Sequence, residues 1–214
     1  MIPVISVVGR SNAGKTTLLE GLIPELRSRG YRIAVGKHIN EEAELDTPGK
    51  DSWRLARAGA DAVVLSTPGK VAVFRPEPEP PVAELQRLIG PDFDLFLIEG
   101  YKQEKLPRIE VRRGRASEPL AVPGELLAVV CDQPSTQSAP CFTFGDTGGL
   151  ADLIEKRFLL GKTQSVGLYV NKKRIPLNPF VQDFIARTVA GMVSALKGVR
   201  GKTRNVTIWL KLTD

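Results

Sequence analysis

Four residues near the N-terminus have the types and the spacing of a site that holds nucleotide phosphates. Gly9, Gly14, Lys15 and Thr16 satisfy the pattern G-x-x-x-x-G-K-[ST]. The glycines let backbone N–H groups point at phosphate oxygens, the lysine reaches the outer phosphates, and the threonine hydroxyl is a ligand for Mg²⁺. We therefore predict a phosphate-binding loop made of Gly9, Arg10, Ser11, Asn12, Ala13, Gly14, Lys15, Thr16 and Thr17.

The residues around this loop predict the two elements that must position it. Residues 2–8 are a short β-branched apolar run, typical of a strand buried on both faces. Residues 16–29 carry leucine and isoleucine at the spacing of one helical face, and Gly30 ends that helix. A second strand at 31–36 completes a βαβ unit, so the positive end of the helix dipole lies at the phosphate site.

Two carboxylates are candidates for catalysis and for binding Mg²⁺ together with Thr16. Glu99 ends an apolar strand predicted over 94–99, at the carboxyl edge of the sheet where ligands bind, whereas Asp94 begins that strand. Asp46 follows the second strand in a polar loop that faces the γ-phosphate in P-loop folds. The alternatives are a helix cap or surface carboxylate for Glu99 and plain turn chemistry for Asp46 in Asp-Thr-Pro-Gly.

Three further polar residues at the same edge each have two interpretations. Arg10 either adds a charge to the phosphates or is solvated, and His38, the only histidine, is either a ligand contact or structural. Asp132 follows a strand predicted over 126–131 and either contacts a nucleotide base or belongs to a turn. The residues alone do not decide between these alternatives.

The rest of the first 160 residues predicts an α/β fold. Helices are expected at 50–59, 82–90 and 148–159, and strands at 61–66, 70–74, 94–100, 108–113, 126–131 and 141–144. Strands that alternate with helices indicate a P-loop NTPase-like, doubly wound and mainly parallel sheet. The strands at 61–66 and 70–74 are expected to form a hairpin through Thr67–Gly69.

The charge distribution predicts a second, smaller domain. Residues 161–214 hold ten Lys or Arg and two Asp, whereas residues 1–160 hold twenty basic and twenty-two acidic residues. A hairpin at 165–177, a helix from Pro179 to residue 196 and a strand at 205–212 follow the break near Gly161. We expect a nucleotide-binding domain at 1–160 and a small basic α+β module at 161–214 that meets an anionic ligand or an acidic protein surface.

Length and composition narrow the class of protein. The chain has 214 residues, of which 42% are hydrophobic and 25% charged, which excludes wholesale disorder. It has no apolar run of the ~18 residues that span a bilayer, and its first residues lack the basic start of a signal peptide, so a cytoplasmic location is expected. Cys131 and Cys141 fit neither a metal spacing nor a disulfide framework, so we expect reduced structural thiols.

Four stretches taken in order resemble the MobB family of molybdopterin-guanine dinucleotide biosynthesis adaptors. They are GRSNAGKTTLL, GKHI, DTPGKDSWRLARAGAD and DLFLIEGYK, with LPRIEVRR after the last. PGKDSWRLARAGA is the most discriminating because general P-loop proteins lack it. The resemblance covers roughly residues 1–160 and leaves the basic module outside. Family members commonly carry KHTHH where this chain has KHIN, so no role of the extra histidines carries over.

The resemblance implies a dimeric protein of molybdenum cofactor biosynthesis that binds GTP with Mg²⁺ and hydrolyses it weakly. Its implied partners are molybdopterin, the guanylyltransferase that attaches GMP to molybdopterin, and molybdenum-insertion proteins. Guanine preference rests on the resemblance alone, because the usual Asn-Lys-x-Asp motif is absent and the NKKR at 171–174 lacks the aspartate.

Two other classes of function stay open at this point. A P-loop small-molecule kinase needs arginines on a lid over the phosphates, and RRGRAS at 112–117 could supply them. A nucleic-acid-binding module with an NTPase switch is supported only by the basic residues after 161, and the salt dependence of binding would test it.

Overall fold

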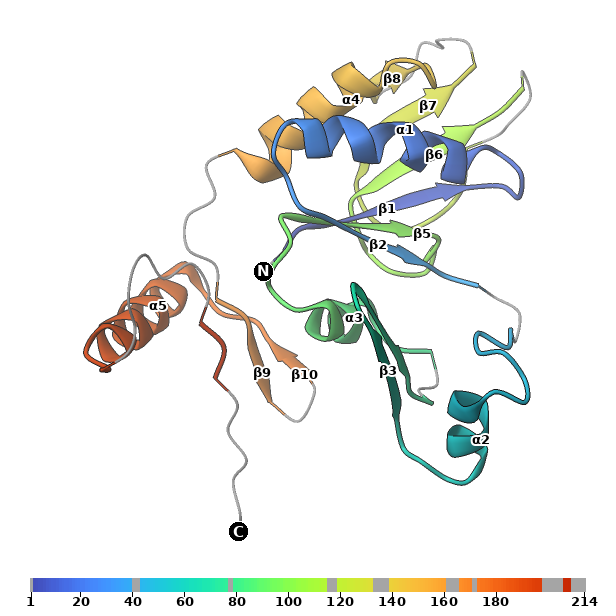
Figure 1. Ribbon diagram of the computed structural model, residues 1–214. Coiled ribbons are helices and arrows are strands. Elements are labelled where there is room, and N and C mark those ends of the chain that lie inside the picture. Colours follow the sequence, from blue (N-terminus) through green and yellow to red (C-terminus); the bar gives the residue numbers. More distant parts are fainter. Residues whose placement is uncertain are drawn as a thin grey trace. The chain divides into compact units, whose positions relative to one another are not determined.

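The computed structural model divides the chain into two compact units. One unit comprises residues 1–38 and 82–214, and the other comprises residues 39–81. The structure describes residues 2–39, 43–76, 79–114, 119–132, 139–160, 166–170, 173–197 and 206–208 (Figure 1). The sequence did not single out 39–81 as a unit, because its helix and strands resemble further members of an alternating α/β chain.

The centre of the larger unit is a six-stranded sheet in which all neighbouring strands run parallel. Its order is β2 (Ile33–Lys37), β5 (Leu95–Glu99), β1 (Val4–Gly9), β6 (Arg108–Arg112), β7 (Leu126–Cys131) and β8 (Cys141–Phe142). The order places β1 between β5 and β6, although β1 is far from both of these strands in the sequence. The predicted mainly parallel sheet is confirmed.

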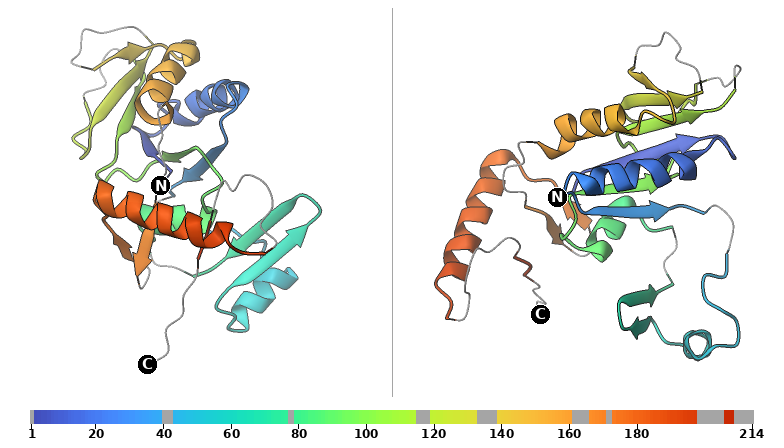
Figure 2. Two further views of the ribbon diagram at one scale, coloured as in Figure 1. Left: turned by 90° about the vertical axis from the view of Figure 1, so that its left-hand side faces the viewer. Right: turned by 45° about the horizontal axis from the view of Figure 1, so that its top comes forward.

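Helices cover both faces of this sheet, as the predicted doubly wound fold requires (Figure 2). The first face packs against α1 (Lys15–Ser28), α4 (Thr147–Ile154) and the π-helix η1 (Glu155–Leu159). The second face packs against α3 (Val82–Ile89), over β1, β2 and β5. The apolar cores on the two faces form because successive strand residues point to opposite faces.

The strand β6 departs from this apolar pattern on one face only. Ile109 and Val111 belong to the core beneath α1 and α4. Glu110 and Arg112 alternate with them and are buried as well, with 1% and 6% of their surfaces exposed. A central strand of a parallel sheet is normally apolar on both faces, so this buried charged pair needs an explanation beyond folding.

A polar cluster joins the end of α1 to the last helices of this unit. The Arg29 guanidinium donates to the carboxylates of Glu25, Asp152 and Glu155 over 2.6–2.9 Å. The Tyr31 hydroxyl donates to Glu155 Oε1 over 2.6 Å. The Tyr31 hydroxyl and then Arg29 lower the pKa of the Glu155 carboxyl, so this carboxylate holds its charge at neutral pH.

The smaller unit consists of α2 (Asp51–Arg57) and a hairpin of β3 (Val63–Thr67) and β4 (Lys70–Phe74). The two strands pair antiparallel from Val63 and Phe74 to Thr67 and Lys70, so the predicted hairpin is confirmed. They form a two-stranded sheet of their own rather than joining the six-stranded sheet.

The basic C-terminal segment contains a hairpin and a long helix. Strands β9 (Leu168–Val170) and β10 (Lys173–Ile175) pair antiparallel, and α5 spans Pro179–Ser194. The Asn178 side chain caps α5 by accepting a hydrogen bond from the Val181 N–H over 2.9 Å. Of the strand predicted at 205–212 only residues 206–208 are described, and they are not in a strand. The domain boundary near Gly161 stays a prediction.

Two observations bear on the composition-based expectations. Cys131 and Cys141 are free thiols on the neighbouring strands β7 and β8, with their Sγ atoms 2.9 Å apart. The sequence did not foresee this contact, because β7 and β8 meet only in the folded sheet. Within the described ranges, no helix is both long and apolar enough to cross a membrane.

The core beneath α1 sets the stability of the larger unit. We expect Leu22→Ala to lower the free energy of unfolding by about 2–5 kcal/mol, because Leu22 is fully buried and its removal leaves a cavity. Urea denaturation measures the change. Leu160→Ala is the matched control, since 62% of Leu160 is exposed, and its effect is expected to stay within about 0.5 kcal/mol. Equal effects of the two substitutions would contradict the assignment of the core.

Candidate functional site

The loop between β1 and α1 follows a backbone path that its glycines permit. A Cβ atom at Gly9 would lie 2.6 Å from the carbonyl oxygen of Val111 on β6, so no side chain fits there. Gly14 has φ 94°, in the left-handed region, and a Cβ atom there would lie 2.9 Å from the Phe144 ring. Gly14 is also the residue that precedes the first turn of α1. The loop therefore turns tightly from a buried strand into a helix N-terminus, the geometry of an anion site.

Lys15 lies against this loop. Its ammonium group donates to the carbonyl oxygens of Arg10 over 3.0 Å and of Gly9 over 3.5 Å. Burial lowers the pKa of Lys15, while the Glu99 carboxylate opposes that shift. A partly desolvated ammonium group beside the N-terminus of a helix is suited to an anionic ligand.

Thr16 and Glu99 meet at the carboxyl edge of the sheet. The Thr16 hydroxyl donates to Glu99 Oε2 over 2.9 Å, and Lys37 Nζ lies 3.8 Å from Glu99 Oε1. The contact forms because β5 is the direct neighbour of β1, with Val7 paired to Glu99 in the register. The structure thus brings together two of the residues that the sequence proposed for Mg²⁺.

The donor set at this edge suits a magnesium ion bound together with a nucleotide. A hydroxyl and a carboxylate are the hard oxygen ligands that Mg²⁺ takes, usually with waters and substrate phosphates completing the octahedron. Among the described residues no group of three or more His, Cys, Asp or Glu could hold a metal ion.

Asp46 belongs to the other compact unit, residues 39–81. Its Oδ1 accepts hydrogen bonds from the Thr47 N–H over 2.8 Å and from the Ser52 hydroxyl over 3.0 Å. These contacts join the turn to the start of α2, which is the turn chemistry considered as the alternative. A role of Asp46 in catalysis or at the metal stays a prediction.

The remaining candidates at this edge have structural partners. The His38 N–H donates to the carbonyl of Glu99 over 2.9 Å, and its ring lies 4.6 Å from that of Tyr101. Asp132 Oδ2 accepts from the Gly114 N–H over 3.1 Å, and its Oδ1 lies 3.9 Å from Arg113 Nε. Both residues therefore make structural contacts at the carboxyl edge, and a role in ligand binding stays a prediction for each.

The segment proposed as a kinase lid is only partly described, since residues 115–118 lie outside the described ranges. Arg112 is buried, and its Nε donates to Glu110 Oε1 over 2.7 Å. The guanidinium of Arg113 lies 5.3 Å from the centre of the Phe144 ring. The Arg112 side chain is therefore buried in the interior and does not have the position of a lid arginine.

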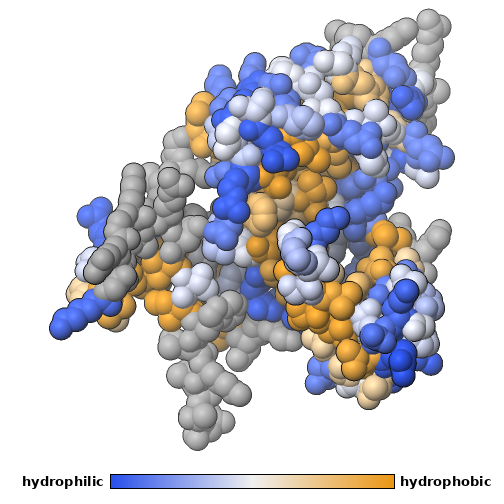
Figure 3. Space-filling model, in the orientation of Figure 1, coloured by the Kyte–Doolittle hydropathy of each residue, from blue (hydrophilic) through white to orange (hydrophobic). Residues whose placement is uncertain are grey.

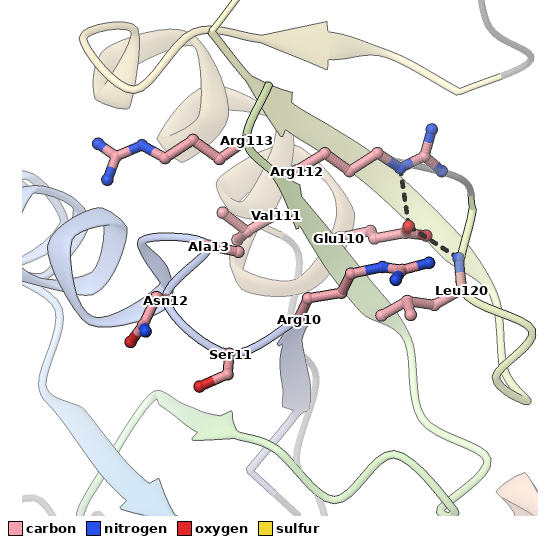
Figure 4. A pocket seen from close by; sticks show the side chains of 9 residues that line it. All are labelled: Arg10, Ser11, Asn12, Ala13, Glu110, Val111, Arg112, Arg113 and Leu120. Carbon is pink, nitrogen blue, oxygen red and sulfur yellow. Dashed lines mark hydrogen bonds and ion pairs between the residues drawn. The ribbon is translucent and has the colours of Figure 1, made fainter. Parts of the chain in front are cut away.

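Sequence reasoning missed a cavity beside the phosphate loop. It has a volume of about 210 Å³ and is lined by Arg10–Ala13, Glu110–Arg113 and Leu120 (Figure 4). The available signal was the alternation of charged and apolar residues in RIEVRR, within a stretch predicted to be a strand. That signal does not reveal that the charged face of the strand is buried, because the sequence does not give the order of the strands in the sheet.

Comparisons with known proteins agree with this architecture. The family model of MobB, "Molybdopterin guanine dinucleotide synthesis protein B", matches residues 4–132. The molybdopterin-guanine dinucleotide biosynthesis adapter protein of Haemophilus influenzae is 37% identical over 157 residues, which cover 72% of this chain and 88% of that protein. The crystal structure of Bacillus subtilis MobB superimposes with a TM-score of 0.59 at 25% identity, over 75% of this chain and all of that one.

The C-terminal segment also has a counterpart. A putative adapter protein of the same name from Methanocaldococcus jannaschii is 28% identical over 92% of each chain, a share that extends beyond residue 160. The H. influenzae relative matches a smaller share of this chain. With the family model matched over most of the α/β unit and the fold shared with solved relatives, this chain belongs to the MobB family.

Proposed function

We propose that this protein is a GTP-binding adaptor of molybdenum cofactor biosynthesis that works in the cytoplasm and hydrolyses GTP slowly. The observation that carries the proposal is the 2.9 Å contact between Thr16 and Glu99 directly beside the phosphate loop. It joins a hydroxyl from the start of α1 to a carboxylate from β5, so both Mg²⁺ ligands and the loop converge at one point.

Each residue of the site has a defined task in this proposal. The loop N–H groups of residues 9–14 hold phosphate oxygens, and Lys15 turns from the loop carbonyls to the β- and γ-phosphates. Thr16 binds Mg²⁺, and Glu99 either binds it directly or positions a water at its edge. Mg²⁺, when bound, neutralises charge on the phosphates. Lys37 lies next to Glu99, with its Nζ 3.8 Å from Oε1 of that carboxylate.

The choice of GTP and of the pathway rests on the relatives. Proteins from H. influenzae and M. jannaschii that resemble this chain are named as adapters of molybdopterin-guanine dinucleotide biosynthesis. The product of that pathway joins a guanine nucleotide to molybdopterin, so GTP is the nucleotide that the site is expected to bind. The partner we propose is the guanylyltransferase that carries out this joining.

We also propose that two copies associate through the hairpin of the smaller unit. Its strands expose Val64, Val71 and Val73 with 57–68% of each side chain accessible, and apolar surface gathers over β3 and β4 (Figure 3). A two-stranded sheet with an apolar face is marginally stable by itself. Association of two hairpins would bury that face.

Lys15→Ala should abolish GTP binding while the fold stays intact. The ammonium group makes charge-assisted hydrogen bonds to phosphates, each worth about 1.5–3 kcal/mol, so affinity should fall at least about tenfold and beyond detection if two bonds are lost. Calorimetry with GTP and Mg²⁺ measures this. Lys156→Ala, which removes an exposed lysine from η1, is the control and should bind normally. A Lys15 variant with near wild-type affinity would refute the site.

GTP binding should take up protons in the alkaline range. Burial lowers the pKa of Lys15 in the free protein, and a bound polyphosphate raises it again, so binding at a pH between the two values adds a proton. The affinity should therefore fall as the pH rises through the lower pKa. Calorimetry at one alkaline pH in two buffers of different ionisation enthalpy checks the linkage. A binding enthalpy that does not depend on the buffer would contradict it.

Glu99→Gln should separate binding from hydrolysis. Glutamine keeps an acceptor for the Thr16 hydroxyl, so GTP should still bind. The loss of the negative charge removes a general base or metal ligand, so turnover should fall by about a hundredfold or more. Single-turnover hydrolysis at saturating GTP measures the rate. A rate equal to that of the wild type would remove Glu99 from the chemistry.

A further inference from the structure

The buried carboxylate of Glu110 is the feature of the larger unit that the proposed nucleotide site does not use. Glu110 pairs with Val8 of β1 on one side and with Val129 of β7 on the other. Both valines are buried, and Glu110 itself is 1% exposed. A carboxylate in such surroundings is strongly destabilising unless each oxygen has hydrogen-bond donors.

Only one oxygen of this carboxylate is satisfied. Oε1 accepts from Arg112 Nε over 2.7 Å and from the Leu120 N–H over 2.9 Å, which uses both of its lone pairs. Oε2 is buried and has no hydrogen-bond partner among the described residues. Glu110 lines the cavity beside the phosphate loop, so a donor supplied there could reach the unsatisfied oxygen.

The cavity has the size of one ring system. Its volume of about 210 Å³ is below the range of about 300–1,000 Å³ that is typical of sites for drug-sized ligands, so it suits a ring system better than a whole nucleotide. Figure 4 shows Arg10 extending from the loop toward Glu110 and Leu120, whereas Arg113 points away from them. Residues 10–13 of the phosphate loop line the cavity, whereas Gly14, Lys15 and Thr16 do not, so the cavity adjoins the cradle proposed for the phosphates.

The charges at the cavity specify the kind of ring. The unsatisfied Oε2 requires an N–H donor, and the exposed guanidinium of Arg10, which also lines the cavity, can donate to an acceptor. An edge that carries an amino group, a ring N–H and a carbonyl in succession meets both demands at once. We propose that the cavity binds the 2-amino-4-oxopyrimidine edge of a pterin, with the amino group on Glu110 Oε2 and the carbonyl on Arg10.

Guanine carries the same edge, and the position of the cavity favours the pterin. Residues 10–13 line the cavity, and these residues also belong to the loop proposed to hold the phosphates. A ring bound there lies beside the phosphates, whereas the base of the same nucleotide lies beyond its ribose. The inference rests on the proposed function, because it gives the adaptor a place for the second substrate of the joining reaction.

The first test compares two ligands on the full-length wild-type protein. Pterin carries the 2-amino group, which can donate a hydrogen bond to Oε2. Lumazine carries an oxo group in its place, and this acceptor would face the acceptor Oε2. Pterin should bind about tenfold more tightly or better, the effect of one hydrogen bond to a charged group. Ligand fluorescence measures both affinities, without GTP and with saturating GTP and Mg²⁺. Pterin should stay bound when GTP is added.

Two variants locate the binding to the cavity. Glu110→Gln keeps a carbonyl oxygen for Arg112 and Leu120 and places an NH₂ group where Oε2 was, so the preference for pterin should vanish or reverse. Leu120→Trp fills the cavity without changing its charge and should weaken pterin binding about tenfold or more, the effect of lost access to a charged acceptor. Leu88→Trp on α3 is the control, because Leu88 is half-exposed and does not line the cavity.

The outcomes separate this inference from the proposed function. Equal binding of pterin and lumazine, or unchanged pterin binding by Leu120→Trp, would overturn the site. If GTP displaces pterin and Leu120→Trp weakens GTP binding equally, the edge recognised is that of guanine and the pterin assignment is wrong. If the wild type binds pterin with the stated preference and fails to bind GTP, the inference stands and the proposed nucleotide function fails.

Discussion

The pairing of β1 with β5 on one side and β6 on the other is the constraint on which the rest of the site depends. The register sets Val7 against Glu99 and Gly9 against Val111, so the residues after β1 emerge between two other strand ends. On the β5 side this places the Glu99 carboxylate within hydrogen-bond distance of Thr16. On the β6 side it brings the Val111 carbonyl so close that only glycine fits at position 9. The geometry of the loop and the contact between Thr16 and Glu99 are thus consequences of one strand order.

The same order gives β6 two different roles on its two faces. Ile109 and Val111 contribute to the core beneath α1 and α4, which stabilises the unit. Glu110 and Arg112 face the other side, where α3 covers β1, β2 and β5 and the chain around Leu120 approaches β6. Because burial of a charged pair rarely adds stability by itself, the pair is better explained by what it can recognise. Residues 10–13 belong both to the phosphate loop and to the lining of this polar cavity, so the loop and the cavity are adjacent.

The segments outside the six-stranded sheet differ in how they relate to the family. Residues 39–81 form a separate compact unit, yet they lie within the stretch that the MobB family model matches. The basic C-terminal segment lies beyond that stretch and has a counterpart in the M. jannaschii relative. The residues of the β1–α1 loop therefore lie within the stretch that the family model matches, and the C-terminal segment, which lies beyond it, carries ten basic and two acidic residues over 161–214.

Local patterns in the sequence were enough to determine the helix and strands around the loop at residues 9–14, and Glu99 at the end of its strand. Glycine spacing, helical periodicity and apolar runs are properties of neighbouring residues, so they can be recognised without the fold. Only the tertiary structure decided that Glu99 contacts Thr16, that Glu110 is buried beside the loop, and that Cys131 and Cys141 meet. These contacts join residues far apart along the chain or on separate strands, and they follow from the order of strands in the sheet. That order is set by the packing of the whole core and is not encoded in any short stretch.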